Sequence, residues 1–233
     1  MNDPASSQTN INFGANNNLQ QAVITLEHVA GRDIIINHDP FDVSLLRDLN
    51  PYLGLESFTY ANHPTYAGRD PLIAGTVAQL TYPGSEQTFL LVTGASGSGK
   101  SSFVQAGVLP RLNRHYREQN MVLAWDVFRA SADPIAALSA CLRRLGATVP
   151  PGQRIDLVSW RTTLAAALPP RYIPAIVIDQ FEEVFGPQVR PEDRLALFEI
   201  LASLPAFHEF PLHIIVTMRS DFLPELFAYP ALY

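Results

Sequence analysis

The sequence has 233 residues, a hydrophobic content of 47% and a formal net charge of -6, which allow a buried core and argue against a general nucleic-acid-binding surface. The single cysteine, Cys141, excludes a disulfide framework and a cysteine-based metal site. No apolar run reaches the roughly 18 residues of a transmembrane helix and the first residues are polar, so we expect a cytoplasmic protein with no membrane partner.

Residues 1–40 differ in composition from the rest of the chain. Asparagines crowd positions 10–18, and two apolar runs follow at 22–26 and 34–36. This pattern suits a small β-hairpin or adaptor, and equally a semi-ordered leader. We therefore place a boundary near residue 40 and assign residues 41–233 to the main domain.

A first helix is predicted in this domain from Pro71 to Leu80, with Asp70 as its N-cap and Leu72, Val77 and Leu80 on its buried face.

The most informative stretch runs from Gly94 to Ser101 and fits the pattern G-x-x-x-x-G-K-[ST] at every fixed position. An apolar strand is predicted before it at 88–93, and a helix after it from Ser101 to Val108, ended by Pro110. Strand, glycine-rich loop and helix N-terminus together form an anion site, since backbone N–H groups and the helix dipole attract phosphate. Lys100 is then expected at the β- and γ-phosphates and the Ser101 hydroxyl on Mg²⁺. The alternative is a chance Gly/Ser turn.

Further strands and helices alternate after this loop. We predict a strand at 121–128, a helix from Asp133-Pro134 to Gly146, an amphipathic helix around 157–168 and a strand at 173–179. The last strand ends in Asp179, a hard oxygen ligand of the kind that Mg²⁺ prefers. Glu182 and Glu183 follow, and one of them is a candidate for polarising an attacking water. The alternative is a strand with an acidic, solvated end.

The final elements are a helix at 191–204, with Leu195, Phe198 and Leu201 on its apolar face, and a strand at 212–217 that leads to Arg219. The carboxyl ends of parallel strands open onto the ligand edge of such a sheet. Arg219 is therefore placed to meet a γ-phosphate, or else to pair with Asp221 at the surface.

From about Pro51 to Tyr233 the chain resembles the STAND class of signal-transducing P-loop ATPases, most closely the first subgroup of the novel STAND NTPases. The resemblance rests on the Gly68-Arg69 lead-in, the phosphate loop, the stretch Asp179-Gln180-Phe181-Glu182-Glu183 and the ending Arg219-Ser220-Asp221-Phe222. The last two stretches are the most specific to this family, because the phosphate loop alone is shared by many families.

The resemblance implies a three-layer α/β ATPase core of the additional-strand type, similar to NACHT and AAA+ proteins, which uses ATP and Mg²⁺ as a switch and self-associates. It implies that Ser101 and Asp179 serve the metal, that Glu182 and Glu183 are the acidic pair, and that Arg219 is the sensor-one arginine. It also implies that Gly68 and Arg69 border the adenine. The expected nucleotide-binding residues are Gly68, Arg69, Gly94, Ala95, Ser96, Gly97, Ser98, Gly99, Lys100, Ser101 and Ser102.

The chain departs from the family plan because it stops just after the sensor-one strand. We therefore expect an incomplete core in which strand 88–93 is an exposed apolar edge and the protein self-associates. Three functions remain open: an ATPase that hydrolyses slowly as a regulatory switch, a nucleotide-binding scaffold without useful hydrolysis, and another P-loop class such as a small-molecule kinase.

Overall fold

The computed structural model describes residues 11–13, 22–26, 56–82, 89–150, 159–203 and 212–229. Its centre is a six-stranded sheet with the order β1-β2-β3-β6-β5-β4. Each neighbouring pair from β2 to β4 is parallel, and only β1 runs antiparallel to its neighbour. The strands are β1 (Ile11–Phe13), β2 (Ala22–Leu26), β3 (Phe89–Gly94), β4 (Val122–Arg129), β5 (Tyr172–Asp179) and β6 (His213–Arg219).

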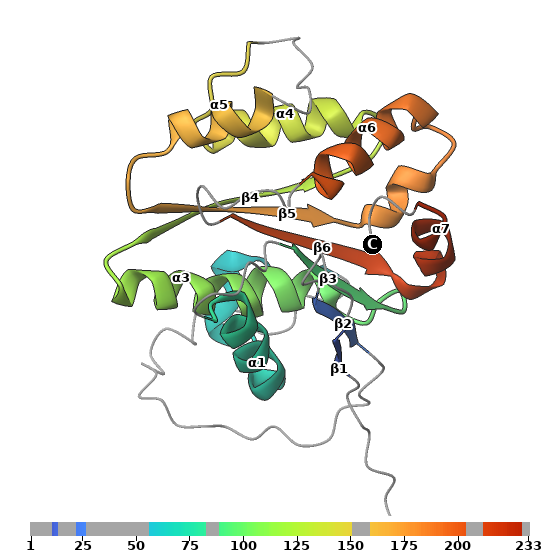
Figure 1. Cartoon of the computed structure of the whole chain (residues 1–233). Helices are drawn as coiled ribbons and strands as arrows, with labels where there is room; N and C mark the ends of the chain where they lie inside the picture. Colours follow the sequence, from blue (N-terminus) through green and yellow to red (C-terminus); the bar gives the residue numbers. More distant parts are fainter. Residues whose placement is uncertain are drawn as a thin grey trace, which may run out of the picture.

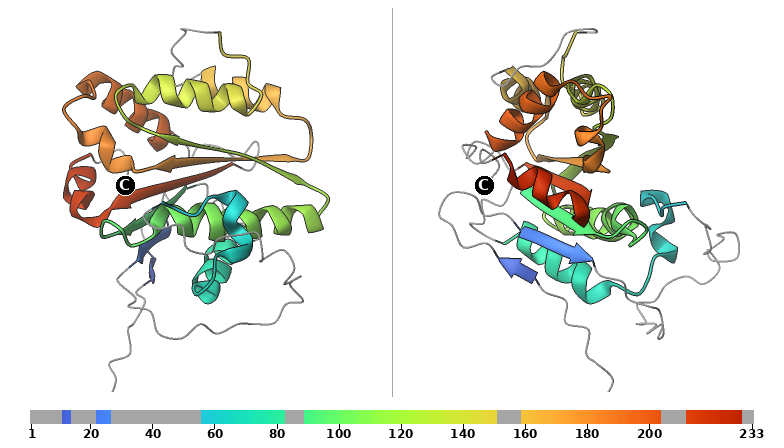
Figure 2. Two further views of the ribbon diagram at one scale, coloured as in Figure 1. Left: turned by 180° about the vertical axis from the view of Figure 1, so that it is seen from behind. Right: turned by 90° about the vertical axis from the view of Figure 1, so that its right-hand side faces the viewer.

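Helices cover both faces of the sheet (Figure 1). On one face lie α4 (Pro134–Arg144), α5 (Ser159–Ala167) and α6 (Pro191–Ala202), and on the other α1 (Asp70–Leu80) and α3 (Leu109–Glu118). The two further views in Figure 2 show the same three layers. The central strands β3, β5 and β6 read as continuous apolar runs because both of their faces are covered. The predicted three-layer α/β fold with a parallel sheet is confirmed.

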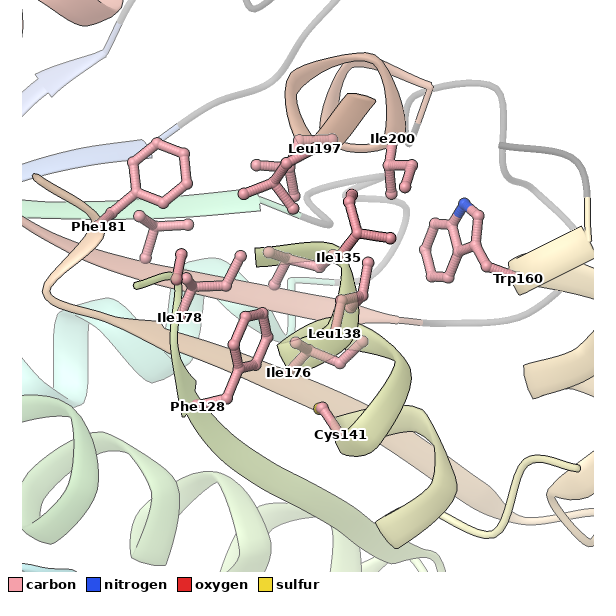
Figure 3. Close-up of a cluster of buried hydrophobic side chains, with 14 of the residues drawn as sticks. Phe128, Ile135, Leu138, Cys141, Trp160, Ile176, Ile178, Phe181, Leu197 and Ile200 are labelled. Carbon is pink, nitrogen blue, oxygen red and sulfur yellow. The ribbon is translucent and has the colours of Figure 1, made fainter. Parts of the chain in front are cut away.

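A separate hydrophobic cluster fills each space between sheet and helices. In the first, Phe128, Ile176 and Ile178 of the sheet meet side chains of all three helices on that face, including Leu138 and Trp160 (Figure 3). In the second, Leu90, Val92 and Val177 meet the helices on the opposite face; their partners there are Ile73, Phe103, Val104, Leu109 and Leu112. These two clusters fix the positions of β3 and β5, the strands that end at the predicted nucleotide site.

The helix after the phosphate loop does not stop at Pro110, so that prediction was wrong. It runs as α2 (Lys100–Ser102), a π-helical segment (Phe103–Val108) and α3. Within the π-helical segment the Leu109 N–H bonds to the Val104 oxygen, five residues back. Pro110 follows this segment, in the first turn of α3, where it donates no N–H and its fixed φ suits the helix. The wider π turn therefore lets the helix continue to Glu118.

Two predicted helix faces need correction. In α1 the fully buried side chains are Ile73, Thr76 and Leu80, while Leu72 and Val77 are only partly buried. In α6 the predicted Leu195 is 48% exposed. The predicted Phe198 and Leu201 are buried together with Leu197 and Ile200, and the centre of this buried face is turned away from Leu195 at 3.6 residues per turn.

The expectation that the phosphate-loop strand forms an exposed edge is also wrong. β2 pairs with β3 in parallel, from Ala22↔Leu90 to Leu26↔Gly94. An unpaired edge leaves a row of backbone N–H and C=O groups without partners, and a strand from the N-terminal region satisfies them here. The hairpin partner of β2 is β1; the second apolar run, 34–36, lies outside the described residues. The domain boundary near residue 40 stays a prediction.

Candidate functional site

The carboxyl ends of β3, β5 and β6 bring the predicted site residues to one edge of the sheet. Gly94 at the end of β3 pairs with Arg219 at the end of β6. On the other side of β6, Val216 pairs with Ile178, one residue before Asp179. The phosphate loop, Asp179 and Arg219 therefore meet, although Gly94 and Arg219 are 125 positions apart in the sequence. The register of three adjacent parallel strands produces this convergence.

The loop between β3 and α2 has the backbone shape that its glycines allow. Gly97 and Gly99 have φ of 74° and 80°, in the left-handed region where a side chain is strained. Ala95, Ser96 and Gly97 are exposed, whereas Lys100 is buried. The Lys100 ammonium donates to the carbonyl oxygens of Gly94, at 3.0 Å, and Ala95, at 2.8 Å. Burial lowers the pKa of Lys100, and the Glu182 carboxylate acts in the opposite direction.

Ser101 and Asp179, the predicted metal residues, are in direct contact. The Ser101 hydroxyl donates to Asp179 Oδ1 at 2.7 Å, a bond between residues 78 positions apart. A hydroxyl beside a carboxylate is a set of hard oxygen donors, which suits Mg²⁺ and its water shell. In the part of the chain that the structure describes, no group of three or more His, Cys, Asp or Glu side chains forms a different metal site.

Thr217 contacts the same carboxylate and was not predicted. Its hydroxyl donates to Asp179 Oδ1 at 2.6 Å and accepts the Gln180 N–H at 3.0 Å. The signal in the sequence was a hydroxyl inside the otherwise apolar run of β6, one residue past the position that pairs with Ile178. Alone, that signal does not distinguish a site residue from a strand threonine, since threonine is common in strands.

The two predicted glutamates differ in their surroundings. Both belong to a 3-10 helix (Phe181–Phe185) that begins after Gln180, which has left-handed backbone angles of φ 56° and ψ 50°. Glu182 Oε2 accepts the backbone N–H of Arg219 at 3.2 Å. The described contacts of Glu183 are made by its backbone, which bonds to Gln180, Gly186 and the side chain of Gln188. Glu182 is therefore the glutamate that joins the strand ends.

A family model described as Novel STAND NTPase 1 matches residues 51–233. The chain belongs to this family. It is accordingly a P-loop NTPase that binds a nucleotide. No curated protein matches the chain. None of the helices in the described ranges is long and apolar enough to cross a membrane.

Solved structures with a related fold include two origin-recognition proteins of Aeropyrum pernix. ORC2, in complexes with ADPNP and ADP, shares 13% identity with a TM-score of 0.51, over 66% of this chain and 41% of that one. ORC1, in complex with DNA, shares 18% identity with a TM-score of 0.49, over 66% of this chain and 40% of that one. The chain thus spans less than half the length of these proteins, and the likeness to ORC2 shows the fold alone.

In this STAND NTPase, Arg69 of the Gly68-Arg69 lead-in packs against the phosphate loop, and Gly68 has a φ of 95°. Arg69 Nη2 donates to the Ser98 oxygen at 2.7 Å, and its guanidinium atoms lie 3.6 to 3.8 Å from where a Cβ on Gly99 would stand. The Ser102 hydroxyl accepts the Phe58 N–H at 2.9 Å. The segment before α1 therefore contacts both the phosphate loop and the start of the helix that follows it, and its role toward the adenine stays a prediction.

Arg219 of the NTPase adopts the surface pairing that its sequence left open. Its Nε and Nη2 donate to the two Asp221 oxygens at 3.1 and 2.5 Å. The guanidinium also lies 5.3 Å from the centre of the Phe222 ring. Hydrogen bonds from Arg219 lower the pKa of Asp221. Both side chains are well exposed, at 40% and 54%, so this pair contributes little and can be exchanged for another partner.

Proposed function

We propose that this chain is the ATP-binding switch core of a signalling STAND NTPase, which binds ATP with Mg²⁺ and hydrolyses it slowly. The observation that carries the proposal is the Ser101–Asp179 hydrogen bond beside Lys100. It joins the start of the phosphate-loop helix to the end of β5, which is the arrangement that places a hydroxyl and a carboxylate on one metal ion. The choice of ATP over GTP is supported by the family resemblance, because the loop contacts phosphates and not the base.

The residues have distinct tasks in this proposal. Backbone N–H groups of the loop bind phosphate oxygens, and Lys100 exchanges its two carbonyl partners for the β- and γ-phosphates. Ser101 and Asp179 hold Mg²⁺, which when bound neutralises charge that develops on the phosphate oxygens. Glu182 orients the attacking water and takes its proton. Arg219 leaves Asp221 to meet the γ-phosphate, a change that costs little because the pair is exposed.

A nucleotide-binding scaffold without useful hydrolysis is the second candidate. It is favoured by Gln180, which directly follows Asp179, and by the bond that ties Glu182 to the Arg219 backbone.

Self-association belongs to the proposal as well. Among the described strands, β4 pairs on one side only, with β5, and so offers an edge for it.

Binding of a fluorescent ATP analogue to Lys100→Ala and Arg117→Ala tests the site. Arg117 is an exposed cation on α3 and serves as the charge-matched control. We expect Lys100→Ala to weaken binding by about 100-fold or more and Arg117→Ala to leave it unchanged, because a cation that contacts phosphates is worth several charge-assisted bonds. Equal affinity of wild type and Lys100→Ala would rule the site out. The rate of ATP hydrolysis by the wild-type protein then distinguishes a hydrolysing switch from a scaffold without useful hydrolysis.

Lys100 is the only lysine in the sequence, which allows a second test. An acyl-phosphate ATP probe transfers its label to an amine held at the phosphates. We expect mass spectrometry to find one labelled side chain, Lys100, and excess ADP to protect it. Labelling should persist at a lower pH than for free lysine, because burial lowers the pKa of Lys100 and leaves more of the neutral amine. Labelling confined to the N-terminal amine would contradict the proposal.

A further inference from the structure

Thr217 lies inside β6, two residues before Arg219, and is completely buried. Its hydroxyl joins two groups on the neighbouring strand end, the carboxylate of Asp179 and the backbone N–H of Gln180. Both groups belong to the segment that carries the metal residue and the candidate catalytic glutamate. A buried hydroxyl that only needed a partner would be satisfied by either one.

The direction of these bonds is fixed by chemistry. The Gln180 N–H can only donate, so Thr217 Oγ1 accepts at that contact, and its own proton goes to Asp179 Oδ1. Ser101 donates to the same oxygen. Two hydroxyls from different elements therefore hold the same carboxylate oxygen, Oδ1. In our proposal the other oxygen, Oδ2, serves the cation and its water shell.

The second partner of Thr217 matters for the turn that follows. Gln180 has left-handed backbone angles, which are disfavoured for a residue with a Cβ and persist where surrounding contacts hold them. The bond from its N–H to Thr217 is such a contact. After this turn Glu182 reaches the backbone N–H of Arg219. β6 thus holds the segment after Asp179 at two points, through the Thr217 side chain and the Arg219 backbone.

We propose that Thr217 is a positioning residue for the Mg²⁺ site. Its hydroxyl fixes the rotation of the Asp179 carboxylate and the turn at Gln180, so that Oδ2 faces the metal and Glu182 faces the loop. This inference rests on the proposed function, because it concerns the metal that Ser101 and Asp179 would hold. Loss of an outer hydrogen bond to a metal-binding carboxylate typically costs about 10- to 100-fold in metal affinity.

The test compares three variants by their Mg²⁺ dependence of nucleotide binding. Thr217→Val keeps the shape and removes the hydroxyl, and Thr217→Ser keeps the hydroxyl. Thr76→Val makes the same replacement at a buried threonine of α1, whose hydroxyl donates to the Leu72 oxygen away from the site. The affinity for a fluorescent ADP analogue is measured in EDTA and over a Mg²⁺ series, and unfolding by urea is measured for each variant.

We expect all variants to bind the nucleotide in EDTA within about twofold of wild type, because the loop itself is unchanged. In Thr217→Val the Mg²⁺ concentration for half of the affinity gain should rise about tenfold or more. Thr217→Ser and Thr76→Val should follow wild type. A wild-type Mg²⁺ dependence in Thr217→Val would overturn the proposal, and so would an equal defect in Thr217→Ser. A purely structural hydroxyl would change only the unfolding.

Amide hydrogen exchange gives a readout that needs neither nucleotide nor metal. Thr217→Val should raise the exchange rate of the Gln180 amide about tenfold, while Thr217→Ser and Thr76→Val leave it unchanged. Unchanged exchange in Thr217→Val would overturn the inference about the turn. A wild-type protein that binds no nucleotide, or binds it without any Mg²⁺ effect, would instead contradict the proposed function, so the two failures are distinguishable.

Discussion

The backbone N–H of Arg219 donates a hydrogen bond to Glu182 Oε2 over 3.2 Å. This contact links the end of β6 to the turn after β5. It also distinguishes Glu182 from Glu183, for which the sequence motif offers no distinction. Glu182 is held at the strand ends near Lys100: burial lowers the pKa of Lys100, and the Glu182 carboxylate acts against that shift. Glu183 is one position further along the 3-10 helix.

We predict that Glu182→Gln slows ATP hydrolysis about 100-fold and that Glu183→Gln slows it less than about threefold, because general-base catalysis contributes on that scale. Single-turnover hydrolysis with radiolabelled ATP measures both. Glutamine keeps an oxygen that can accept the Arg219 N–H, so a loss of fold is not expected from either variant. Equal effects of the two substitutions would contradict this assignment.

A second prediction concerns the discrimination between ATP and ADP. Arg219→Ala should reduce the ATP over ADP preference about tenfold, because a charge-assisted bond to the γ-phosphate is lost. Asp221→Asn should raise ATP affinity by up to about fivefold, since it removes the exposed and therefore weak ion pair that competes for Arg219. Calorimetric titrations with ADP and a non-hydrolysable ATP analogue provide the ratio. Reduced ATP affinity in Asp221→Asn would show that the pair itself is needed.

A third prediction follows from the pairing of β2 with β3. Removal of residues 1–26 should expose the β3 edge and produce concentration-dependent self-association in sedimentation velocity. Removal of residues 1–20 deletes β1 but keeps β2 beside β3 and is the matched control; it should associate less than the 27–233 fragment, because the β3 edge stays paired. A monomeric 27–233 fragment with unchanged unfolding would mean that β2 adds nothing to the sheet.

The fourth prediction concerns pH and the buried contact between His213 Nε2 and Tyr116 Oη, which are 2.6 Å apart. Burial lowers the pKa of His213 to about 4 from its usual value near 6.5 and raises the pKa of Tyr116 to about 12. The neutral imidazole is therefore the folded form, and its contribution is complete above pH 6.5 and is lost as the pH falls toward 4. Between pH 7 and pH 5 we expect a loss of about 2 kcal/mol in the free energy of unfolding.

Urea titrations of wild type, His213→Gln and His63→Gln isolate this contribution from that of the carboxylates. His63 is exposed and serves as the control. The part of the stability loss between pH 7 and pH 5 that comes from His213 should be absent in His213→Gln and present in His63→Gln. A wild-type pH profile in His213→Gln would assign the acid sensitivity to other groups. His115, whose charge also disfavours protonation of His213, is kept in all three proteins.

Local patterns predicted much of this molecule. The spacing of Gly94, Gly99 and Lys100 specifies a loop whose backbone faces phosphate, whatever surrounds it. Asp133 before Pro134 predicted the start of α4, where the Asp133 carboxylate accepts the Ala136 N–H at 2.9 Å. Such signals work because the groups that interact lie within a few residues of one another. The continuation of the helix past Pro110 was missed because it depends on the π turn before it.

The sequence by itself determined the fold class, the phosphate loop and the family, because apolar periodicity and short motifs act over a few residues or one turn. Only the tertiary structure decided that β2 lies beside β3, that Glu182 and not Glu183 contacts Arg219, and that Thr217 holds Asp179. Each of these contacts joins residues 37 or more positions apart. Strand order and register bring them together, and both depend on how the whole chain packs around two cores rather than on any stretch of it.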